Sequence, residues 1–219
     1  MKTVSVVLSG CGYLDGAEIR ESVATLWALS LHDVEVKIFA PDEAQQVVMN
    51  HYSGKATSET RNMLTEAARI ARGKIEPLSQ LTEHHYDALI MPGGFGVAKN
   101  LCTFAADGAG GIILFKELQS DIIAMHSDGR PIGAICIAPA LIGLALKGRK
   151  IEMTLGEDGP EAEELRKMGH MHIVKKPNEI HVDVANKIVT TPAYMYSDGP
   201  INEVFEGIKK LVDEVVGMS

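Results

Sequence analysis

Short apolar runs that end in glycine loops alternate along this chain with segments of helical periodicity. Residues 4–8 read Val-Ser-Val-Val-Leu and lead to Gly10 and Gly12, and residues 88–91 and 132–135 are similar runs. Strands that alternate with helices in this way predict an α/β fold, with a mostly parallel sheet covered by helices on both faces. The ligand crevice of such a fold lies beyond the carboxyl ends of the strands, so chemistry is expected in the loops that follow these runs.

Between the apolar runs, hydrophobic residues recur at helical spacing. Ile19, Val23 and Trp27 lie four residues apart and predict a helix that ends at His32 and Asp33. By the same criteria, helices are expected at residues 62–72, 114–125, 138–146, 161–168 and 204–215, and strands at 35–39, 151–154, 172–174 and 187–191. The polar stretch 51–61 has no periodicity that assigns it to either type.

Size and charge narrow the functional classes. A chain of 219 residues and 23.6 kDa predicts a single domain spanning residues 1–219. With 21 Lys and Arg against 29 Asp and Glu, the net charge of −8 argues against binding to nucleic acid or to an anionic membrane surface. The longest apolar stretch, residues 132–146, is shorter than the ~20 residues that a membrane-spanning helix needs.

The cysteines indicate the compartment. Cys11, Cys102 and Cys136 are too few for a disulfide framework, and their spacing does not match a metal finger. The first apolar run is also too short for the hydrophobic region of a signal peptide. These features predict a protein of the reducing cytoplasm.

Cys136 lies where an apolar strand passes directly into a helix. Ala138 and Pro139 follow it closely, and no residues remain for a connecting loop. This pattern is typical of a nucleophile elbow, in which a sharp turn exposes the side chain and the helix N-terminus lowers the thiol pKa. The alternative is a buried structural cysteine, which is the more common role of a lone cysteine in an apolar run.

Two other strand-end segments are placed to meet Cys136. The glycines of residues 92–96 would let backbone N–H groups bind an anion, although the same residues also suit a simple tight turn. They match neither the dinucleotide-binding fingerprint nor the phosphate-binding P-loop. Glu18 and Glu21 lie at the start of the first helix, where a carboxylate either caps the helix in solvent or points into the crevice.

Other possible ligands give weaker signals. Cys11 lies in a strand-end loop and is expected either to be buried or to approach Cys136. His170, His172 and His181 show part of a zinc-site pattern but have no nearby cysteine or carboxylate partner in the sequence. Surface histidines are therefore expected, and no metal site is predicted.

Five ordered motifs together resemble the ElbB family of glyoxalase and isoprenoid-biosynthesis-associated proteins. They are Ser9-Gly10-Cys11-Gly12, Asp15-Gly16-Ala17-Glu18, Pro92-Gly93-Gly94-Phe95-Gly96 followed by Ala98-Lys99-Asn100-Leu101, Cys136-Ile137-Ala138-Pro139, and Val189-Thr190-Thr191-Pro192-Ala193. The family belongs to the ThiJ/PfpI branch of the class I glutamine amidotransferase-like superfamily. The resemblance covers almost the whole chain and implies a flavodoxin-like three-layer sandwich and a homodimer.

The resemblance also implies roles for individual residues. Cys136 occupies the position of the nucleophile, and Glu21 that of the glutamate that hydrogen-bonds the cysteine sulfur. Glu18 is the alternative acid if the correspondence is shifted by one helical turn. The oxyanion hole and substrate contacts fall to Gly93, Gly94 and Ile137.

The same resemblance sets an expected reaction. Ile137 follows Cys136 where protease-like and amidotransferase-like members rely on a histidine, so hydrolysis of peptides or glutamine is not expected. The family implies instead a cofactor-independent conversion of glyoxal, a small dicarbonyl, to glycolate. In that reaction Cys136 adds to the aldehyde and Glu21 moves a proton between the carbons, without metal or nucleotide. The alternative is a non-enzymatic role in which Cys136 senses oxidants.

Overall fold

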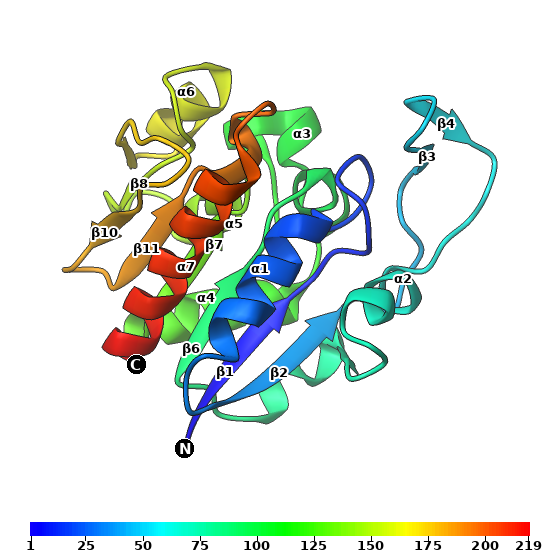
Figure 1. Ribbon diagram of the computed structural model, residues 1–219. Helices are drawn as coiled ribbons and strands as arrows, with labels where there is room; N and C mark the ends of the chain where they lie inside the picture. The colour runs from blue at the N-terminus through cyan, green and yellow to red at the C-terminus, as the bar shows by residue number, and fades with distance from the viewer.

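The computed structural model describes all residues 1–219, and its strands and helices alternate along most of the chain (Figure 1). The strands are β1 Lys2–Val7, β2 Val34–Ala40, β3 Val48–Asn50, β4 Lys55–Thr57, β5 Glu76–Pro77, β6 Ala88–Met91, β7 Ile132–Ile135, β8 Glu152–Met153, β9 Met171–His172, β10 His181–Asp183 and β11 Ile188–Thr191. The helices are α1 Ile19–Leu29, α2 Met63–Ile70, α3 Phe104–Asp107, α4 Lys116–Ser127, α5 Pro139–Ala145, α6 Pro160–Lys167 and α7 Ile201–Met218. None of them is both long and apolar enough to cross a lipid bilayer.

The central sheet has seven strands in the order β10-β11-β7-β6-β1-β2-β5. Every neighbouring pair is parallel except β10 and β11. The chain adds β2 and β5 on one side of β1, and β6, β7 and β11 on the other, so the strand order reverses at β1 and β6. A crevice is expected at such a switch point, at the carboxyl ends of the strands.

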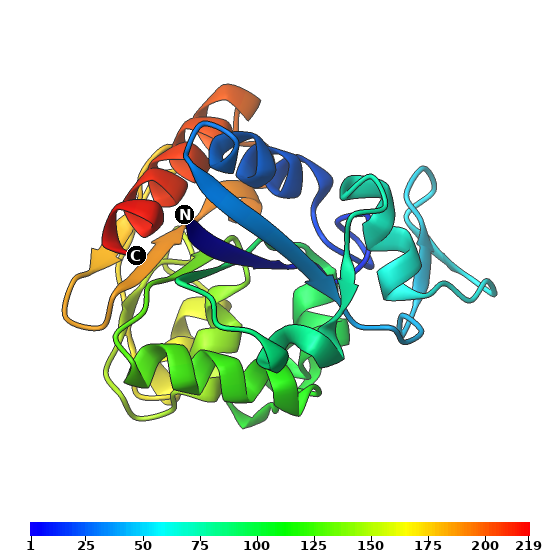
Figure 2. The ribbon, with the colours of Figure 1, turned by 90° about the horizontal axis from the view of Figure 1, so that it is seen from below.

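Helices cover both faces of the sheet, which confirms the predicted α/β sandwich. Helices α1 and α7 pack against each other on one face, and α4 lies on the other, as the view from below shows (Figure 2). Strand β1 contributes to both cores because its side chains alternate: Val4 and Val6 face α1 and α7, whereas Val7 faces the opposite core. The buried strands are apolar throughout for this reason.

The polar stretch 51–61, which had no assignable periodicity, contains the turn and the second strand of a hairpin. Strands β3 and β4 pair antiparallel and project from the body of the molecule beside α2 (Figure 1). The antiparallel edge strand β10 was also not expected from the sequence, because residues 181–183 are too few to show a period.

Candidate functional site

Cys136 occupies a strained turn between β7 and α5. Its φ angle is +60°, which is unusual for a residue other than glycine, and its N–H donates to the Thr191 carbonyl at 2.9 Å. The Ala138 N–H donates to the Ile135 carbonyl at 3.0 Å, which tightens the turn, and α5 begins at Pro139. The strand–turn–helix geometry predicted for the elbow is therefore present.

Glu21 is fully buried on α1 and reaches the thiol. Its Oε2 atom accepts a hydrogen bond from the Gly93 N–H at 2.9 Å, and its Oε1 atom accepts one from the Tyr194 N–H at 3.2 Å. The carboxyl group also lies beside the Cys136 side chain: both border the same point at Gly93, and each group shifts the pKa of the other. Three segments far apart in the sequence therefore hold one carboxyl group beside one thiol.

The loop after β6 is packed tightly against both groups at Gly93. A Cβ atom at this position would lie 2.5 Å from the Cys136 Cβ atom and 2.8 Å from Glu21 Oε2, so only glycine fits. Because the Gly93 N–H already donates to Glu21, it is not free to bind an oxyanion. The assignment of Gly93 to the oxyanion hole is wrong: Gly93 positions the acid instead.

Backbone donors surround the sulfur itself. The N–H groups of Gly94 and Ile137 lie near the Cys136 side chain and lower the pKa of its thiol in part. Gly94 has a φ of +99°, and a side chain there would collide with the backbone of residues 16–18. Both N–H groups therefore lie near the place where the oxygen on a substrate carbon bonded to the sulfur would develop charge.

Burial governs the ionisation of the pair. It raises the pKa of Glu21 to about 8, and the negative charge of Glu18 adds to the increase. Burial, followed by the charge of Glu21, also raises the pKa of the Cys136 thiol well above its ordinary value. The low thiol pKa predicted from the helix N-terminus is therefore wrong, because desolvation of a side chain enclosed by the glycine loop outweighs the donors. Both groups hold their protons at neutral pH.

Glu18 has a different task. It is the N-cap of α1, and its Oε2 atom accepts the Glu21 N–H at 2.6 Å. Its carboxyl group lies on the wall of the cavity but is not among the groups bonded to Cys136. Of the two acids that the sequence left open, Glu21 is the partner of the thiol and Glu18 is the helix cap.

A cavity of about 850 Å³ opens in front of the thiol at the carboxyl end of the sheet. It is lined by Tyr13, Glu18, Ile19, Arg20, Gly94, Phe95, Cys136, Ile137, Glu161, Tyr194, Met195, Ser197 and Asp198. No histidine is among them. A histidine base for the hydrolysis of an amide is therefore absent from the cavity.

The weaker sequence candidates lie elsewhere. Cys11 is not part of the cavity wall, and its charged neighbours are Glu66, Arg69, Asp15 and Arg61. It does not join Cys136 in the site.

The histidines are structural rather than exposed. His170 is 4% exposed, and its Nε2 atom contacts the Gly143 carbonyl at 3.0 Å. The His172 side chain is fully buried, and its Nε2 atom accepts the Leu155 N–H at 3.1 Å. The expectation of surface histidines fails for these two, because their ring nitrogens meet backbone groups of segments that are distant in the sequence. The structure contains no group of three or more side chains placed to hold a metal ion.

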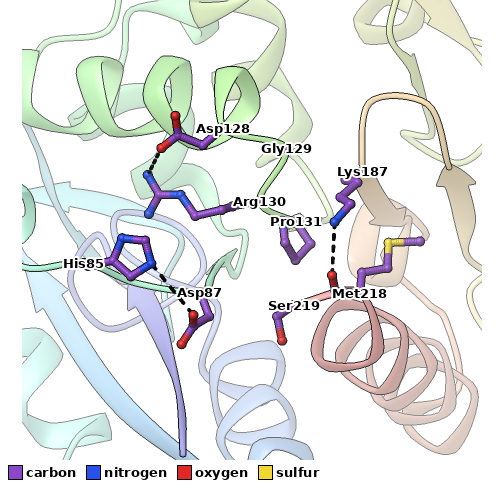
Figure 3. A pocket seen from close by; sticks show the side chains of 9 residues that line it. All are labelled: His85, Asp87, Asp128, Gly129, Arg130, Pro131, Lys187, Met218 and Ser219. Atoms are coloured by element: carbon purple, nitrogen blue, oxygen red, sulfur yellow. Dashed lines mark hydrogen bonds and ion pairs between the residues drawn. The ribbon is translucent and has the colours of Figure 1, made fainter.

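A second, smaller hollow of about 330 Å³ lies at the opposite ends of the sheet strands (Figure 3). Asp87, Pro131 and Lys187, which line it, directly precede β6, β7 and β11. It therefore lies at the amino ends of the parallel strands, away from Cys136.

Two residues of the site were missed by the sequence analysis. Tyr194 orients the Glu21 carboxyl group through its N–H, and Arg20 lies beside it on the cavity wall. The rule that loops after strands form the site would have found Tyr194, since it follows β11 and comes directly after the Val189-Thr190-Thr191-Pro192-Ala193 motif. Arg20 had no such signal, because it looks like any exposed residue of an amphipathic helix.

Comparison with known proteins identifies the family and the fold of this chain. No family model matches the chain. A human protein named glutamine amidotransferase-like class 1 domain-containing protein 3, mitochondrial, is 44% identical over 99% of this chain and 83% of its own length. The crystal structure of an isoprenoid biosynthesis protein with an amidotransferase-like domain from Ehrlichia chaffeensis is 35% identical, covers 100% of this chain and 99% of its own, and has a TM-score of 0.90.

The fold extends to more distant proteins. Drosophila melanogaster DJ-1beta is 17% identical, with 99% of this chain and 91% of the other aligned at a TM-score of 0.60, which shows the shared fold alone. The flavodoxin-like sandwich implied by the resemblance is thereby confirmed.

The compartment predicted from the sequence is corrected by these relatives. The names of the human protein and of its rat and zebrafish counterparts describe them as mitochondrial, so the cytoplasmic prediction is wrong. Its basis was that free thiols indicate a reducing compartment, and a reducing compartment is not necessarily the cytoplasm. The isoprenoid biosynthesis description belongs to the Ehrlichia protein, whereas the curated relatives carry other names. On the identity along almost its whole length, the chain belongs to the class I glutamine amidotransferase-like family.

Proposed function

We propose that this protein is a cofactor-independent glyoxalase that converts small dicarbonyl compounds such as glyoxal to 2-hydroxy acids such as glycolate. The superfamily includes glyoxalase and stress-response proteins, which makes this chemistry available to the fold. The observation that carries the proposal is the buried pair of Cys136 and Glu21, which lie side by side at the end of a cavity and shift each other's pKa. A carboxyl group with a pKa of about 8 is poised to take up and release protons near neutral pH.

The pair accounts for each step of the reaction. The Cys136 sulfur bonds to an aldehyde carbon while the thiol proton passes to the carbonyl oxygen, which gives a hemithioacetal. Because the pKa of Glu21 is about 8, a fraction of it is ionised near neutral pH; this carboxylate takes the hydrogen of that carbon as a proton and returns the proton to the neighbouring carbon, so that a thioester and an alcohol result. Water then releases the 2-hydroxy acid and restores the thiol. The product equals substrate plus water, and no outside oxidant or reductant is required.

The backbone around the sulfur supports the first step. The N–H groups of Gly94 and Ile137 are positioned to stabilise the oxygen of the hemithioacetal as it forms. The absence of histidine from the cavity wall matters less for an aldehyde than for an amide, because no amine has to leave.

Measuring glycolate formation from glyoxal tests the proposal. Cys136→Ser should reduce the rate to that of the buffer, since serine cannot form the thioester. Cys11→Ser is the matched control, because Cys11 lies outside the cavity, and it should keep the wild-type rate. Turnover that survives in Cys136→Ser, or a wild-type rate no faster than that of a free thiol, would refute the proposal.

Oxidant sensing by Cys136 is the second candidate. The donors from Gly94 and Ile137 that face the sulfur would stabilise a sulfinate anion after oxidation. The raised thiol pKa opposes rapid oxidation at neutral pH, because the thiolate is the reactive form. Mass spectrometry after peroxide treatment separates the two: oxygen gained at Cys136 before Cys11, in a protein without glyoxal turnover, favours the sensor.

A further inference from the structure

The cavity is far larger than glyoxal needs. Its volume of about 850 Å³ lies in the range of roughly 300–1,000 Å³ that accommodates drug-sized ligands, so a two-carbon dicarbonyl leaves most of it unfilled. Tyr13, Ile19 and Phe95 line it with side chains that are 45–49% exposed and offer apolar contact. The volume and lining fit a carbonyl compound that carries a further group.

Arg20 is the only basic side chain on the cavity wall. Three carboxylates line the same cavity, and Arg20 forms no ion pair with any of them. Arg61, Arg69, Arg130 and Arg166 are each paired with Asp or Glu, whereas Arg72 and Arg149, which lie outside the cavity, are unpaired like Arg20. A guanidinium group at a cavity wall without a carboxylate partner is free to bind one from outside.

The guanidinium group of Arg20 is also held in place. Its Nη1 atom donates to the Tyr194 hydroxyl at 3.1 Å, and its Cζ atom lies 5.8 Å from the centre of the Tyr194 ring. The remaining N–H groups of the planar guanidinium group are left for a ligand. Tyr194 also donates its N–H to Glu21, so one residue ties Arg20 to the reacting pair.

We propose that Arg20 binds a carboxylate on the substrate, and that the site takes α-oxo aldehydes bearing an acid group a few carbons from the aldehyde. The inference rests on the proposed function for the thiol addition. For 4,5-dioxopentanoate, the sulfur bonds to the aldehyde carbon, a proton moves from that carbon to the ketone carbon, and water releases 2-hydroxyglutarate. No electron donor or acceptor is needed, because one carbon is oxidised as its neighbour is reduced.

The carboxylates of the cavity do not prevent this binding. Glu161 and Asp198 are exposed at the rim, where water and salt screen their charges. Glu18 is occupied as the cap of α1, since it accepts the Glu21 N–H. The guanidinium group of Arg20, which is bonded to the Tyr194 hydroxyl, therefore provides a cationic partner on the cavity wall for an anion that enters beside Tyr194.

Protection of Cys136 from alkylation tests the proposal without turnover. Butanal and 4-oxobutanoate share a four-carbon chain and an aldehyde, and neither has the second carbonyl that the full reaction needs. Iodoacetamide labelling at about pH 8.5, mapped by mass spectrometry with Cys11 as an internal reference, reports which aldehyde occupies the thiol. We expect 4-oxobutanoate to protect Cys136 at a concentration roughly tenfold below that of butanal, the ratio expected for one charge-assisted pair.

The variants locate the effect. Arg20→Met should remove the preference for 4-oxobutanoate, and Arg20→Lys should keep part of it, since lysine retains the charge but not the fork. Lys99→Met is the matched control, because Lys99 lies over the Phe95 ring but does not line the cavity, and it should keep the whole preference. Circular dichroism confirms that each variant is folded.

Several results would overturn the inference: equal protection by the two aldehydes in the wild type, protection by neither, or a preference that survives in Arg20→Met. Failure of the proposed function gives a different pattern. If glyoxal is not turned over but the preference for 4-oxobutanoate is intact and depends on Arg20, the carboxylate site stands and the glyoxalase proposal falls.

Discussion

The two ends of the central sheet treat charge in opposite ways. In the hollow at the amino ends of the strands, Arg130 pairs with Asp128 at 2.9 Å and Lys187 Nζ donates to the Met218 carbonyl at 3.2 Å (Figure 3). In the cavity at the carboxyl ends, Arg20 has no carboxylate partner, and the Glu21 carboxyl group is buried against a thiol. Arg130 is neutralised by Asp128 and supports the fold, whereas Arg20 has no ion-pair partner and remains available to a ligand.

The two ends also differ in how closely the backbone packs. Gly93, in the loop behind the cavity wall, has no space for a side chain, because neighbouring atoms of Cys136 and Glu21 approach within 3 Å of where its Cβ would lie. Gly129 in the hollow has a φ of +67°, but nothing lies within 4 Å of its missing Cβ. One glycine is required by the site and the other by its backbone conformation alone.

The largest expected effect comes from Gly93→Ala, and Gly129→Ala is its matched control. Gly93→Ala should displace both reacting groups and abolish glyoxal turnover, with a loss beyond the ~10²-fold expected for misplacing one group, and overpacking should lower the free energy of unfolding by roughly 1–3 kcal/mol. Gly129→Ala should cost about 1 kcal/mol through backbone strain and leave turnover unchanged. Steady-state kinetics and urea unfolding measure both; equal losses of turnover would show that the ends are not functionally distinct.

The next effect separates the two acids within the cavity. Glu21→Gln keeps the volume of the buried side chain but cannot carry a proton between carbons, so turnover should fall by roughly 10²-fold or more. Glu18→Gln should change kcat far less, because Glu18 caps the helix and is not bonded to the thiol. If Glu18→Gln causes the larger loss, the roles of the two glutamates are reversed.

The last effect, on stability with no expected change in turnover, concerns a buried acid near the opposite end. Asp121 on α4 is 6% exposed, and burial raises its pKa to about 6 while Arg130 lowers it in part. A carboxyl group with a raised folded-state pKa contributes stability that is complete below its unfolded pKa of about 4 and is lost as the pH rises through about 6. The free energy of unfolding of the wild type should therefore fall by up to about 3 kcal/mol over this pH window, and this fall should be absent in Asp121→Asn.

The same measurement on Glu21→Gln sharpens the comparison. The folded-state pKa of Glu21 is about 8, so its contribution should persist to higher pH and disappear between about pH 4.5 and 8. Urea unfolding across this range gives both profiles. If the two variants lose the pH dependence of the free energy of unfolding over the same pH range, the two acids do not differ in pKa as the structure indicates.

Much of the fold was predictable because it depends on local patterns. The apolar runs at residues 88–91 and 132–135 coincide with β6 and β7, and helical spacing located α1, α4 and α7 to within a few residues. The hairpin of β3 and β4 was not predictable, since three-residue strands leave no period to detect. The edge strand β10 escaped for the same reason.

The candidate site divides in the same way. The amino-acid sequence by itself determined that a cysteine stands at a strand-to-helix turn and that a glycine loop and two glutamates follow other strands, because spacing and residue type are local properties. Only the tertiary structure decided that Glu21 rather than Glu18 meets Cys136, that the Gly93 N–H is already bonded, and that Tyr194 orients the acid. It also reversed the expected pKa of the thiol, since desolvation depends on which distant segments close over a side chain.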